Sequence, residues 1–395
     1  MPPWPPFTFV TLSAVGFLGR LSYEMARSPL TALYAKHLGA PTSVIGLIVA
    51  AVTVTGIVVK LPAGALADIL GFKKIMVSGL LVKATGPWLY LIVRSWQQLL
   101  LVRFYHGFST ALYAPAASAL VAKRYPKERA HRLGLYSAAE NAGVVLGPVI
   151  GAAILAAYSF DVAFIVSGVI GTLALLLVIR IPRDVPAAVS GPRPTAGAVT
   201  QQLVQGVREI VSDKTIRLTS LIEGTLYMGV GALQAYLPLY ALTVHISVGR
   251  MGLLFGGQGI ASILSRPTMG TLSDRVGRRP IIVIGVLLCA TMLAVMPHVA
   301  GFIPLLVLNV LFGLGTGMVT PSTTAMIGDR VKAGNFGSAM GVFGSLWDAG
   351  HAGGPIIAGF LIAAFGYQVS FLAIAIVIVA ALAVFILGTR QSELA

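Results

Sequence analysis

Charged residues are scarce in this sequence. Asp, Glu, Lys and Arg together make up 10% of its 395 residues, whereas they average about 25% in soluble domains. Hydrophobic residues account for 56%, and the mean hydropathy is +0.88. So few polar groups cannot cover the surface of a soluble fold, and the composition therefore indicates an integral membrane protein.

Several kinds of catalytic or binding motif are also missing. Cys289 is the only cysteine, so no disulfide can form within the chain. The sequence has no Walker-type phosphate loop, no nucleophile elbow, no paired-cysteine motif and no cluster of metal ligands. We therefore expect no cofactor, no metal and no enzymatic activity.

Apolar sequence is abundant, in runs of about 20 residues, the length that crosses a hydrocarbon core of about 30 Å. Connections between the runs are mostly too short for a separate soluble domain. The sequence therefore predicts an all-α membrane protein with 12 transmembrane helices. The predicted spans lie near residues 7–33, 43–66, 75–94, 98–121, 134–157, 162–181, 216–241, 250–272, 281–300, 302–326, 337–363 and 367–388.

The formal net charge of +15 would suit a nucleic-acid partner, but its placement indicates a membrane topology instead. Basic residues gather on short loops beside apolar runs, as the positive-inside rule requires of cytoplasmic loops. We therefore expect a multi-pass protein of the cell (inner) membrane, with both termini cytoplasmic, contacts to membrane lipid and no nucleic-acid partner. The clearest basic clusters are Lys123, Arg124, Lys127, Arg129 and Arg132, and then Arg275, Arg278 and Arg279.

One glycine-rich segment occurs twice. Residues 134–152 read GLYSAAENAGVVLGPVIGA, and residues 341–359 read GVFGSLWDAGHAGGPIIAG. Gly147 and Pro148 correspond to Gly354 and Pro355, at an offset of 207 residues. Glycines let helix backbones approach closely in a membrane bundle, and neighbouring helices satisfy the carbonyl that proline leaves free. The chain is therefore predicted to be an internal duplication.

The first copy resembles a motif of the major facilitator superfamily, the antiporter motif in the fifth helix of drug/proton exporters. The matching residues are Gly134, Gly143, Gly147, Pro148 and Gly151, while Ala152 stands where the family usually has another glycine. This resemblance implies two six-helix bundles, residues 1–181 and 216–395, related by a pseudo-twofold axis. Residues 182–215 would form a cytoplasmic linker that contains a short amphipathic helix.

Two loops resemble the cytoplasmic signature of the same family, which latches the cytoplasmic ends of helices. The second copy matches throughout, whereas the first has Ile69 and Phe72 at positions that are normally basic. We therefore expect a weaker latch in the first copy. The matching residues are Gly64, Asp68, Gly71 and Lys73 in the first loop, and Gly270, Asp274, Arg275, Gly277 and Arg278 in the second.

The first predicted span contains three charged residues, Arg20, Glu24 and Arg27. Their spacing puts them on one helix face, where Glu24 can pair with both arginines. Charges inside a membrane span are costly, so they are functional candidates by default. A self-neutralising ion cluster that only positions the helix is the alternative. Arg103 resembles a family arginine implicated in proton coupling, and its alternative role is to reach the membrane surface.

Acidic residues inside the spans are the candidates for proton coupling. A carboxyl group favours its neutral form when buried and its charged form beside an arginine, so it can be switched by movement. Glu24 is the first choice, and the other proton-coupling candidates are Arg103, Glu140, Asp348 and His351. A structural hydrogen bond to a neighbouring helix is the alternative for Glu140, Asp348 and His351.

The remaining polar residues of the spans are assigned to a substrate cavity by the resemblance. Aromatic and methionine residues lie between them in sequence, as an apolar ligand requires. The predicted cavity residues are Arg20, Tyr23, Arg27, Asn141, Glu223, Tyr227, Gln234 and Asn309.

Three functions fit these observations. The first is a monomeric, proton-coupled exporter of small amphiphilic compounds. The second is a carrier for one specific, anionic metabolite or siderophore-like molecule, which Arg20, Arg27 and Arg103 favour. The third is a membrane sensor or membrane-embedded enzyme that transports nothing, and the lack of an output domain or a catalytic constellation argues against it.

Overall fold

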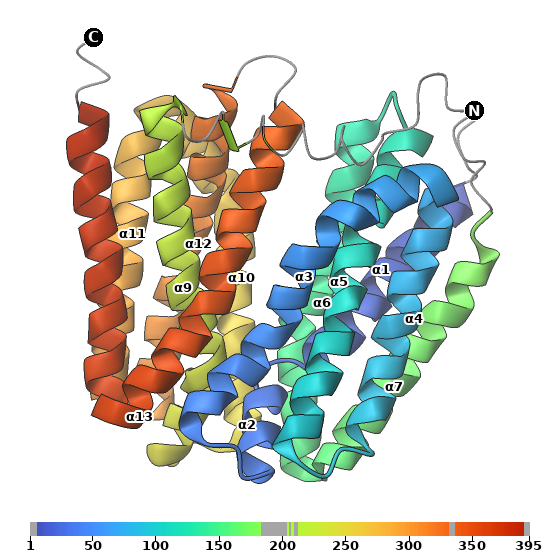
Figure 1. Ribbon diagram of the computed structural model, residues 1–395, viewed down its shortest axis with the longest axis horizontal. Helices are drawn as coiled ribbons and strands as arrows, with labels where there is room; N and C mark the ends of the chain where they lie inside the picture. The colour runs from blue at the N-terminus through green and yellow to red at the C-terminus, as the bar shows by residue number, and fades with distance from the viewer. Residues whose placement is uncertain (1–5, 183–203, 205–206, 209–211, 332–335, 391–395) are drawn as a thin grey trace. The chain divides into compact units, whose positions relative to one another are not determined.

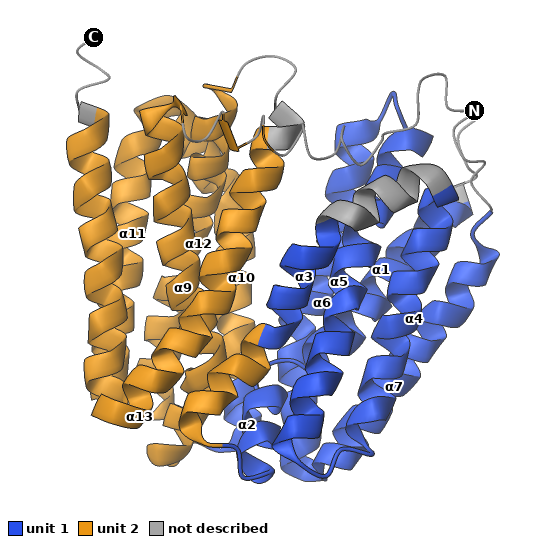
Figure 2. Cartoon of the chain, viewed as in Figure 1, with its two compact units in different colours: residues 1–40, 51–194, 247–252 blue, residues 41–50, 195–246, 253–395 orange. Residues whose placement is uncertain are grey.

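The computed structural model describes residues 6–182, 204, 207–208, 212–331 and 336–390. Within these ranges it describes only the backbone of residues 6, 61–69, 336–338 and 390. The described chain is helical almost throughout and contains no strand, as Figure 1 shows. It divides into two compact units, residues 1–40, 51–194 and 247–252, and residues 41–50, 195–246 and 253–395, which Figure 2 shows in blue and orange.

Unit 1 is a bundle of long helices. Within it α1 packs against α6 and α7, and α4 packs against α5 and α7 (Figure 1). Its helices are α1 (Pro6–Met25), α2 (Leu30–His37), α3 (Thr42–Leu70, whose first residues belong to unit 2), α4 (Phe72–Tyr90), α5 (Trp96–Arg124), α6 (Arg129–Ala157), α7 (Phe160–Leu177) and the short η1 (Val178–Arg180).

Unit 2 repeats this pattern. Within it α9 packs against α13, and α11 packs against α12 and α13. Its helices are α9 (Lys214–Thr243), α10 (Val248–Val276, whose first residues belong to unit 1), α11 (Arg278–Val295), η2 (Met296–His298), α12 (Phe302–Gly328) and α13 (Phe336–Arg390).

Most predicted spans overlap one helix each, with differences at both ends of the chain. The first span, 7–33, is divided between α1 and α2 by a turn. The last two spans, 337–363 and 367–388, both lie in α13, which is interrupted at Gly366, where φ is 77° and ψ is 176°. Glycine adopts this backbone conformation without the steric cost that other residues meet. The total of twelve spans therefore stays a prediction.

Local sequence signals explain where several helices begin. Ser95 starts α5 by accepting a hydrogen bond from the backbone N–H of Gln98, and Ser159 does the same for Val162 at the start of α7. The carboxylate of Asp213 accepts from two N–H groups in the first turn of α9. Such caps satisfy backbone donors that have no partner inside the helix.

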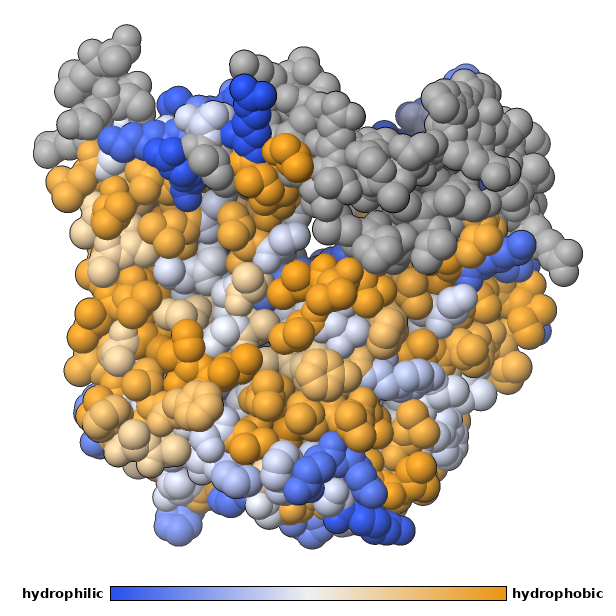
Figure 3. Space-filling model, in the orientation of Figure 1, coloured by the Kyte–Doolittle hydropathy of each residue, from blue (hydrophilic) through white to orange (hydrophobic). Residues whose placement is uncertain are grey.

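The surface of the helices is apolar. Among the described residues, six helical segments are long and apolar enough to cross a membrane, including 42–60, 160–180 and 302–328. In Figure 3 hydrophobic side chains cover the middle of the helices on the visible face, and hydrophilic ones gather at helix ends. Large exposed apolar side chains such as Ile92, Leu264 and Phe360 suit a surface covered by lipid tails.

The internal duplication is visible in the backbone. Gly71 precedes α4 with φ of 94°, and Gly277 precedes α11 with φ of 96°, 206 residues apart. Only glycine adopts such left-handed conformations readily. The division into 1–181, 182–215 and 216–395 remains a prediction, and most of the predicted amphipathic helix in the linker lies outside the described residues.

Candidate functional site

The glycines of the antiporter-like motif form the contact between α6 and α1. A Cβ atom added at Gly143 would lie 2.8 Å from the backbone nitrogen of Leu21, and one at Gly151 would lie 2.6 Å from the carbonyl oxygen of Met25. At Gly147 it would lie 2.5 Å from Cβ of Glu24. The backbones can meet only because these residues are glycines. The motif therefore allows α6 to pack closely against the part of α1 that contains Arg20 and Glu24. Helix α6 continues through Pro148 without interruption.

The three charged residues of the first predicted span form ion pairs, although Arg27 lies in the turn after α1 rather than on the helix. Oε1 of Glu24 is 2.8 Å from Nη2 of Arg20 and 3.4 Å from Nη1 of Arg27. Glu24 is 4% exposed. Ser22 and Ser167 fix this part of α1 against α7, since each hydroxyl donates to the other residue's backbone carbonyl at 2.7 Å.

Arg103 is enclosed within unit 1, because it is only 1% exposed. Its Nη1 donates to the hydroxyl of Tyr90 at 3.4 Å, and that hydroxyl is 2.9 Å from Nδ1 of His106. The ring of His106 packs edge-on against Tyr23 of α1, with the ring centroids 5.1 Å apart. Arg103 is thereby connected to the charged face of α1 through three side chains.

Lys83 of α4 completes this group, and the site prediction omitted it. It is 2% exposed, and its ammonium lies 4.2 Å from the centre of the Tyr113 ring. Glu140, Arg20 and Glu24 act on it electrostatically. A single lysine inside a predicted span was the available signal. We call Arg20, Glu24, Arg27, Lys83, Arg103 and Glu140 the charged cluster.

In unit 2, α13 packs on α9 in the same manner. Cβ atoms added at Gly350 and Gly354 would overlap the backbone carbonyls of Gly224 and Met228. Gly134 and Gly341, at the start of the two motif copies, have no neighbour within 4 Å of an added Cβ. The close approach thus belongs to the later glycines of each copy.

A buried carboxyl group lies in a different setting on α9. Glu223 is 1% exposed, and its Oε2 accepts a hydrogen bond from the hydroxyl of Thr323 at 2.8 Å. The hydroxyls of Tyr227 and Thr320 are 3.4 Å apart beside it. We call Glu223, Tyr227, Thr320 and Thr323 the hydroxyl cluster. Thr323 is 100 residues from Glu223, so local sequence patterns gave no signal for the contact.

The other predicted site residues of unit 2 take separate positions. Nε2 of His351 is 3.0 Å from Oε1 of Gln234, which connects α13 to α9, and Asp348 is half-buried. Asn309 is fully buried and donates to the carbonyl of Leu254 at 2.9 Å, so its amide holds α12 against α10. Asn141 of unit 1 is half-buried. The predicted site residues thus fall into groups within each unit.

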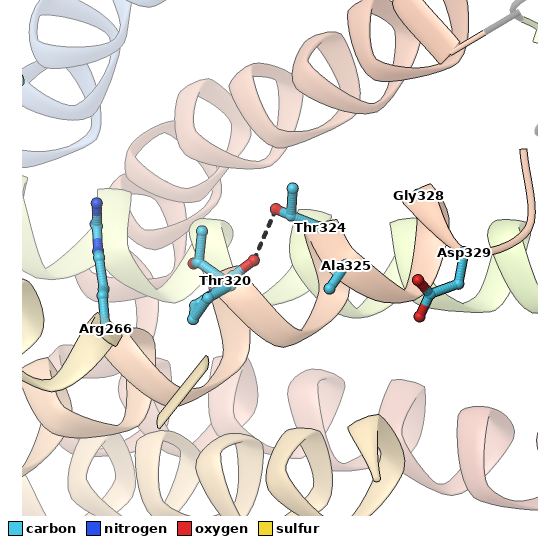
Figure 4. A pocket seen from close by; sticks show the side chains of 7 residues that line it. Arg266, Thr320, Thr324, Ala325, Gly328 and Asp329 are labelled. Atoms are coloured by element: carbon cyan, nitrogen blue, oxygen red, sulfur yellow. Dashed lines mark hydrogen bonds between the residues drawn. The ribbon is translucent and has the colours of Figure 1, made fainter. Parts of the chain in front are cut away.

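A pocket of about 620 Å³ lies along α12, beside the hydroxyl cluster. Thr320 contributes to both, because it lines the pocket and contacts Tyr227. Arg266 of α10 faces the pocket (Figure 4) and acts electrostatically on Glu223. Arg266 was missed from the sequence, although it is a charged residue within a predicted span. The lining is Arg266, Thr320, Pro321, Thr324, Ala325, Gly328 and Asp329.

The two latch loops make parallel contacts. Lys73 donates to the backbone carbonyl of Ile181, and Arg279 donates to that of Ile386 at 2.8 Å. In the second loop Arg278 also pairs with Asp274 and, at 3.3 Å, with Asp329 at the end of α12. The side chains of residues 61–69, which include Gly64 and Asp68, lie outside the description. Gly270 has no neighbour within 4 Å of an added Cβ, and Arg275 is exposed.

We expect Asp274→Asn to change the balance between inward-open and outward-open forms more than Asp68→Asn does. The substitution keeps the shape of the side chain but removes the charge that holds Arg278. Exposed ion pairs contribute about 0.2–1 kcal/mol, so the population ratio should change by roughly 1.5- to 5-fold. Spin-label distance distributions across the second loop would measure the change. If neither variant moves the distribution, the latch assignment is wrong.

Comparison with known sequences finds transporters that match most of the chain. An uncharacterised MFS-type transporter of Methanocaldococcus jannaschii is 25% identical over 355 residues, 90% of this chain and 89% of that protein. The quinolone resistance protein NorA of Staphylococcus aureus is 25% identical over 336 residues, 84% of each chain. Both are similar over nearly their whole length, so the likeness concerns the complete helix bundle.

Solved structures share the fold at low sequence identity. The nucleoside transporter NupG aligns with a TM-score of 0.83 and 13% identity, covering 97% of this chain and 99% of its own. A bacterial homologue of the human lysosomal transporter Spinster aligns with a TM-score of 0.81 and 16% identity, covering 97% and 96%. The predicted fold, an all-α membrane protein of the major facilitator type, is thereby confirmed.

A family model decides the membership. The model described as Major Facilitator Superfamily matches residues 12–244 and 219–394, which together include nearly all of the chain. The helix bundle, the apolar spans and the transporter relatives all agree with this match. The chain therefore belongs to the Major Facilitator Superfamily and is an integral membrane transporter.

Proposed function

We propose that this transporter exports small amphiphilic compounds in exchange for protons, by alternating access in the cell membrane. The observation that supports this most is the position of Glu24. A buried carboxylate, paired with Arg20 of its own helix and with Arg27 of the turn that follows α1, lies against Gly147 of the antiporter-like motif. Glu24 is thus both the group that we propose to carry the proton and a part of the contact between α1 and α6.

The coupling follows from the two forms of the carboxyl group. A neighbouring arginine favours the ionised form of a carboxyl group, and burial without such a partner favours the neutral form. Glu24 would then take up a proton in one state of the cycle and release it in the other. Glu24 therefore remains the first proposed proton carrier.

Glu223 is the second proposed proton carrier, rather than only a cavity residue. Thr323 donates a hydrogen bond to Glu223 from its hydroxyl, and Arg266 acts on Glu223 electrostatically. A hydroxyl can accept from a protonated carboxyl as well as donate to an ionised one. The hydroxyl cluster can therefore hold either form of Glu223 without an ion pair.

Export is supported by similarity to a resistance protein. The name of NorA refers to quinolone resistance, and this chain is 25% identical to it over 84% of its length. The antiporter-like motif, in which Gly143, Gly147 and Gly151 make the contact with α1, supports the same direction of transport. The excess of basic side chains in the charged cluster favours a second candidate function, a carrier for one anionic metabolite.

Efflux from cells would test the export proposal. Cells that lack their own exporters and express this protein should accumulate less of several chemically unrelated amphiphiles than cells with an empty vector. A protonophore should remove the difference. Efflux confined to one compound would favour the specific carrier, and no difference from the vector for any compound would contradict transport out of the cell.

A further inference from the structure

Lys83 occupies an unusual environment near the middle of α4. The side chain is 2% exposed, and its stem lies against α1, where an added Cβ at Gly19 would be 3.5 Å from its Cδ. The ammonium faces two aromatic rings, at 4.2 Å from the centre of Tyr113 and 5.8 Å from that of Tyr23. Among the described residues it has neither an ion pair nor a hydrogen-bond acceptor.

Aromatic rings are a poor replacement for water around an ammonium group. A ring face attracts a cation, but it accepts none of the three N–H hydrogens as an oxygen would. The Tyr113 hydroxyl accepts a hydrogen bond from Tyr136, and the Tyr136 hydroxyl also interacts with the carboxylate of Glu140. The acceptors near Lys83 are thus engaged with one another, and a buried charge remains without a direct partner, which is costly.

A second cation of the charged cluster also has an unused donor. Nε of Arg20 is buried without a hydrogen-bond partner, although Nη2 of the same guanidinium pairs with Glu24. The Arg20 side chain is 28% exposed, so the cluster is not fully enclosed by protein at this residue. Arg20 and Lys83 both lie within 6 Å of the Tyr23 ring, at 5.7 and 5.8 Å. Both cations therefore lie close to the Tyr23 ring, and Arg20 acts on Lys83 electrostatically.

The charges of the cluster do not balance. Four basic residues, Arg20, Arg27, Lys83 and Arg103, lie with two carboxylates, Glu24 and Glu140. The groups acting on Lys83 from α1 and α6 are Arg20, Glu24 and Glu140, and His106 of α5 also senses its charge. In a low-dielectric interior an anion would be attracted to this excess, while a second cation would add to the repulsion.

We propose that Arg20 and Lys83 form a subsite that binds the acidic group of an amphiphilic organic anion, such as a carboxylate or sulfonate. The anion would accept from Nε of Arg20 and from the Lys83 ammonium, the donors that have no acceptor in the described structure. The aromatic rings of Tyr23 and Tyr113 would contact the adjoining apolar part. This inference takes the amphiphilic nature of the substrate from the proposed function. It adds that the substrate carries a negative charge.

A matched set of probes tests the subsite. The probes are 6-(2-naphthyl)hexanoate, the corresponding alcohol and the corresponding amine, which share one apolar body and differ in charge at pH 7. Binding to the purified full-length protein in detergent would be measured by isothermal titration. We expect the wild type to bind the acid at least tenfold more tightly than the amine, with the alcohol between them.

Two variants separate recognition from packing. Lys83→Met should weaken binding of the acid by about 10- to 100-fold, the range for a hydrogen bond to a charged group, and leave binding of the alcohol within about twofold. Lys83→Arg should retain most of the preference for the acid. Equal weakening of all three probes, or an unchanged preference in Lys83→Met, would overturn the proposal.

If Lys83→Met does not fold, binding of the acid and the amine to the wild type is sufficient to test the subsite. A wild type that binds the amine as tightly as the acid would overturn the subsite without any variant. The assay uses no pH gradient, so its result is independent of proton coupling. If proton-driven export were disproved, a measured preference for the acid would still support the subsite. If the protein preferred the amine, the subsite would be wrong, but the proposed export would be unaffected.

Discussion

Glu24→Gln is expected to abolish accumulation of substrate driven by a pH gradient while leaving transport down the substrate's own gradient intact. Glutamine keeps the shape of the side chain and can still contact Arg20, which lies 2.8 Å from the carboxylate. It cannot bind and release a proton, so the cycle loses its connection to the proton gradient. Proteoliposomes that contain the purified variant would be measured with and without an imposed pH gradient.

Glu128→Gln provides the matched control. Glu128 also pairs with an arginine four residues away, Arg132, at 2.8 Å, but its side chain is 56% exposed. Such an exposed pair contributes little, and accumulation should match the wild type. If Glu24→Gln still concentrates substrate as the wild type does, Glu24 is a structural ion pair. The proton carrier must then be sought at Glu223, Asp348 or Glu140.

Gly147→Leu should reduce transport by at least about tenfold while the protein still inserts into the membrane. The added Cβ alone would lie 2.5 Å from Cβ of Glu24 and 3.0 Å from the backbone nitrogen of Met25. The α1–α6 contact must therefore open, and such overpacking costs about 1–3 kcal/mol. Initial transport rates, normalised to the amount of protein in the membrane, would measure the effect.

Gly134→Leu is the control for this substitution. It changes the first glycine of the same motif, where an added Cβ meets nothing within 4 Å, and its transport rate should remain near that of the wild type. Equal rates for Gly147→Leu and the wild type would show that the close contact between α6 and α1 is not required for transport. Equal losses in both variants would point to an effect of leucine on the helix itself.

Local periodicity made part of this site predictable. Residues four apart share a helix face, so the sequence alone placed Arg20 beside Glu24. Arg27 also pairs with Glu24, as expected, but from the turn after α1. Glycines at 143, 147 and 151 recur every four residues, which predicts a flat stripe for close packing. The helix that this stripe meets was not predictable, because no local rule relates α6 to α1.

The missed residues depend on contacts between distant parts of the chain. The environment of Lys83 is formed by Tyr23 and Tyr113, which come from two other helices. Thr323 reaches Glu223 across 100 residues, and Asp329 reaches Arg278 across 51. A periodic pattern carries no information about such pairs. Arg266 and Lys83 could still have been singled out, because each is a charge within a predicted span.

Helix ends were predictable only where the chain marks them by sequence. Glycine with a left-handed backbone separates α10 from α11 at Gly277, and the loop signature predicted this turn. The division of the first span between α1 and α2, and the continuation of α13 on both sides of Gly366, left the apolar pattern unchanged. Hydropathy reports burial in lipid rather than the path of the backbone, so it did not distinguish these arrangements.

Proton movement during transport is the most direct test of the central claim. Proteoliposomes would contain the purified protein and a trapped pH-sensitive dye, with no initial pH gradient, and a transported amphiphile would be added outside. We expect entry of the amphiphile to release protons from the lumen, with a rise in luminal pH that is absent in Glu24→Gln although the amphiphile still enters. Entry of the amphiphile into wild-type proteoliposomes without any change in luminal pH would contradict proton exchange.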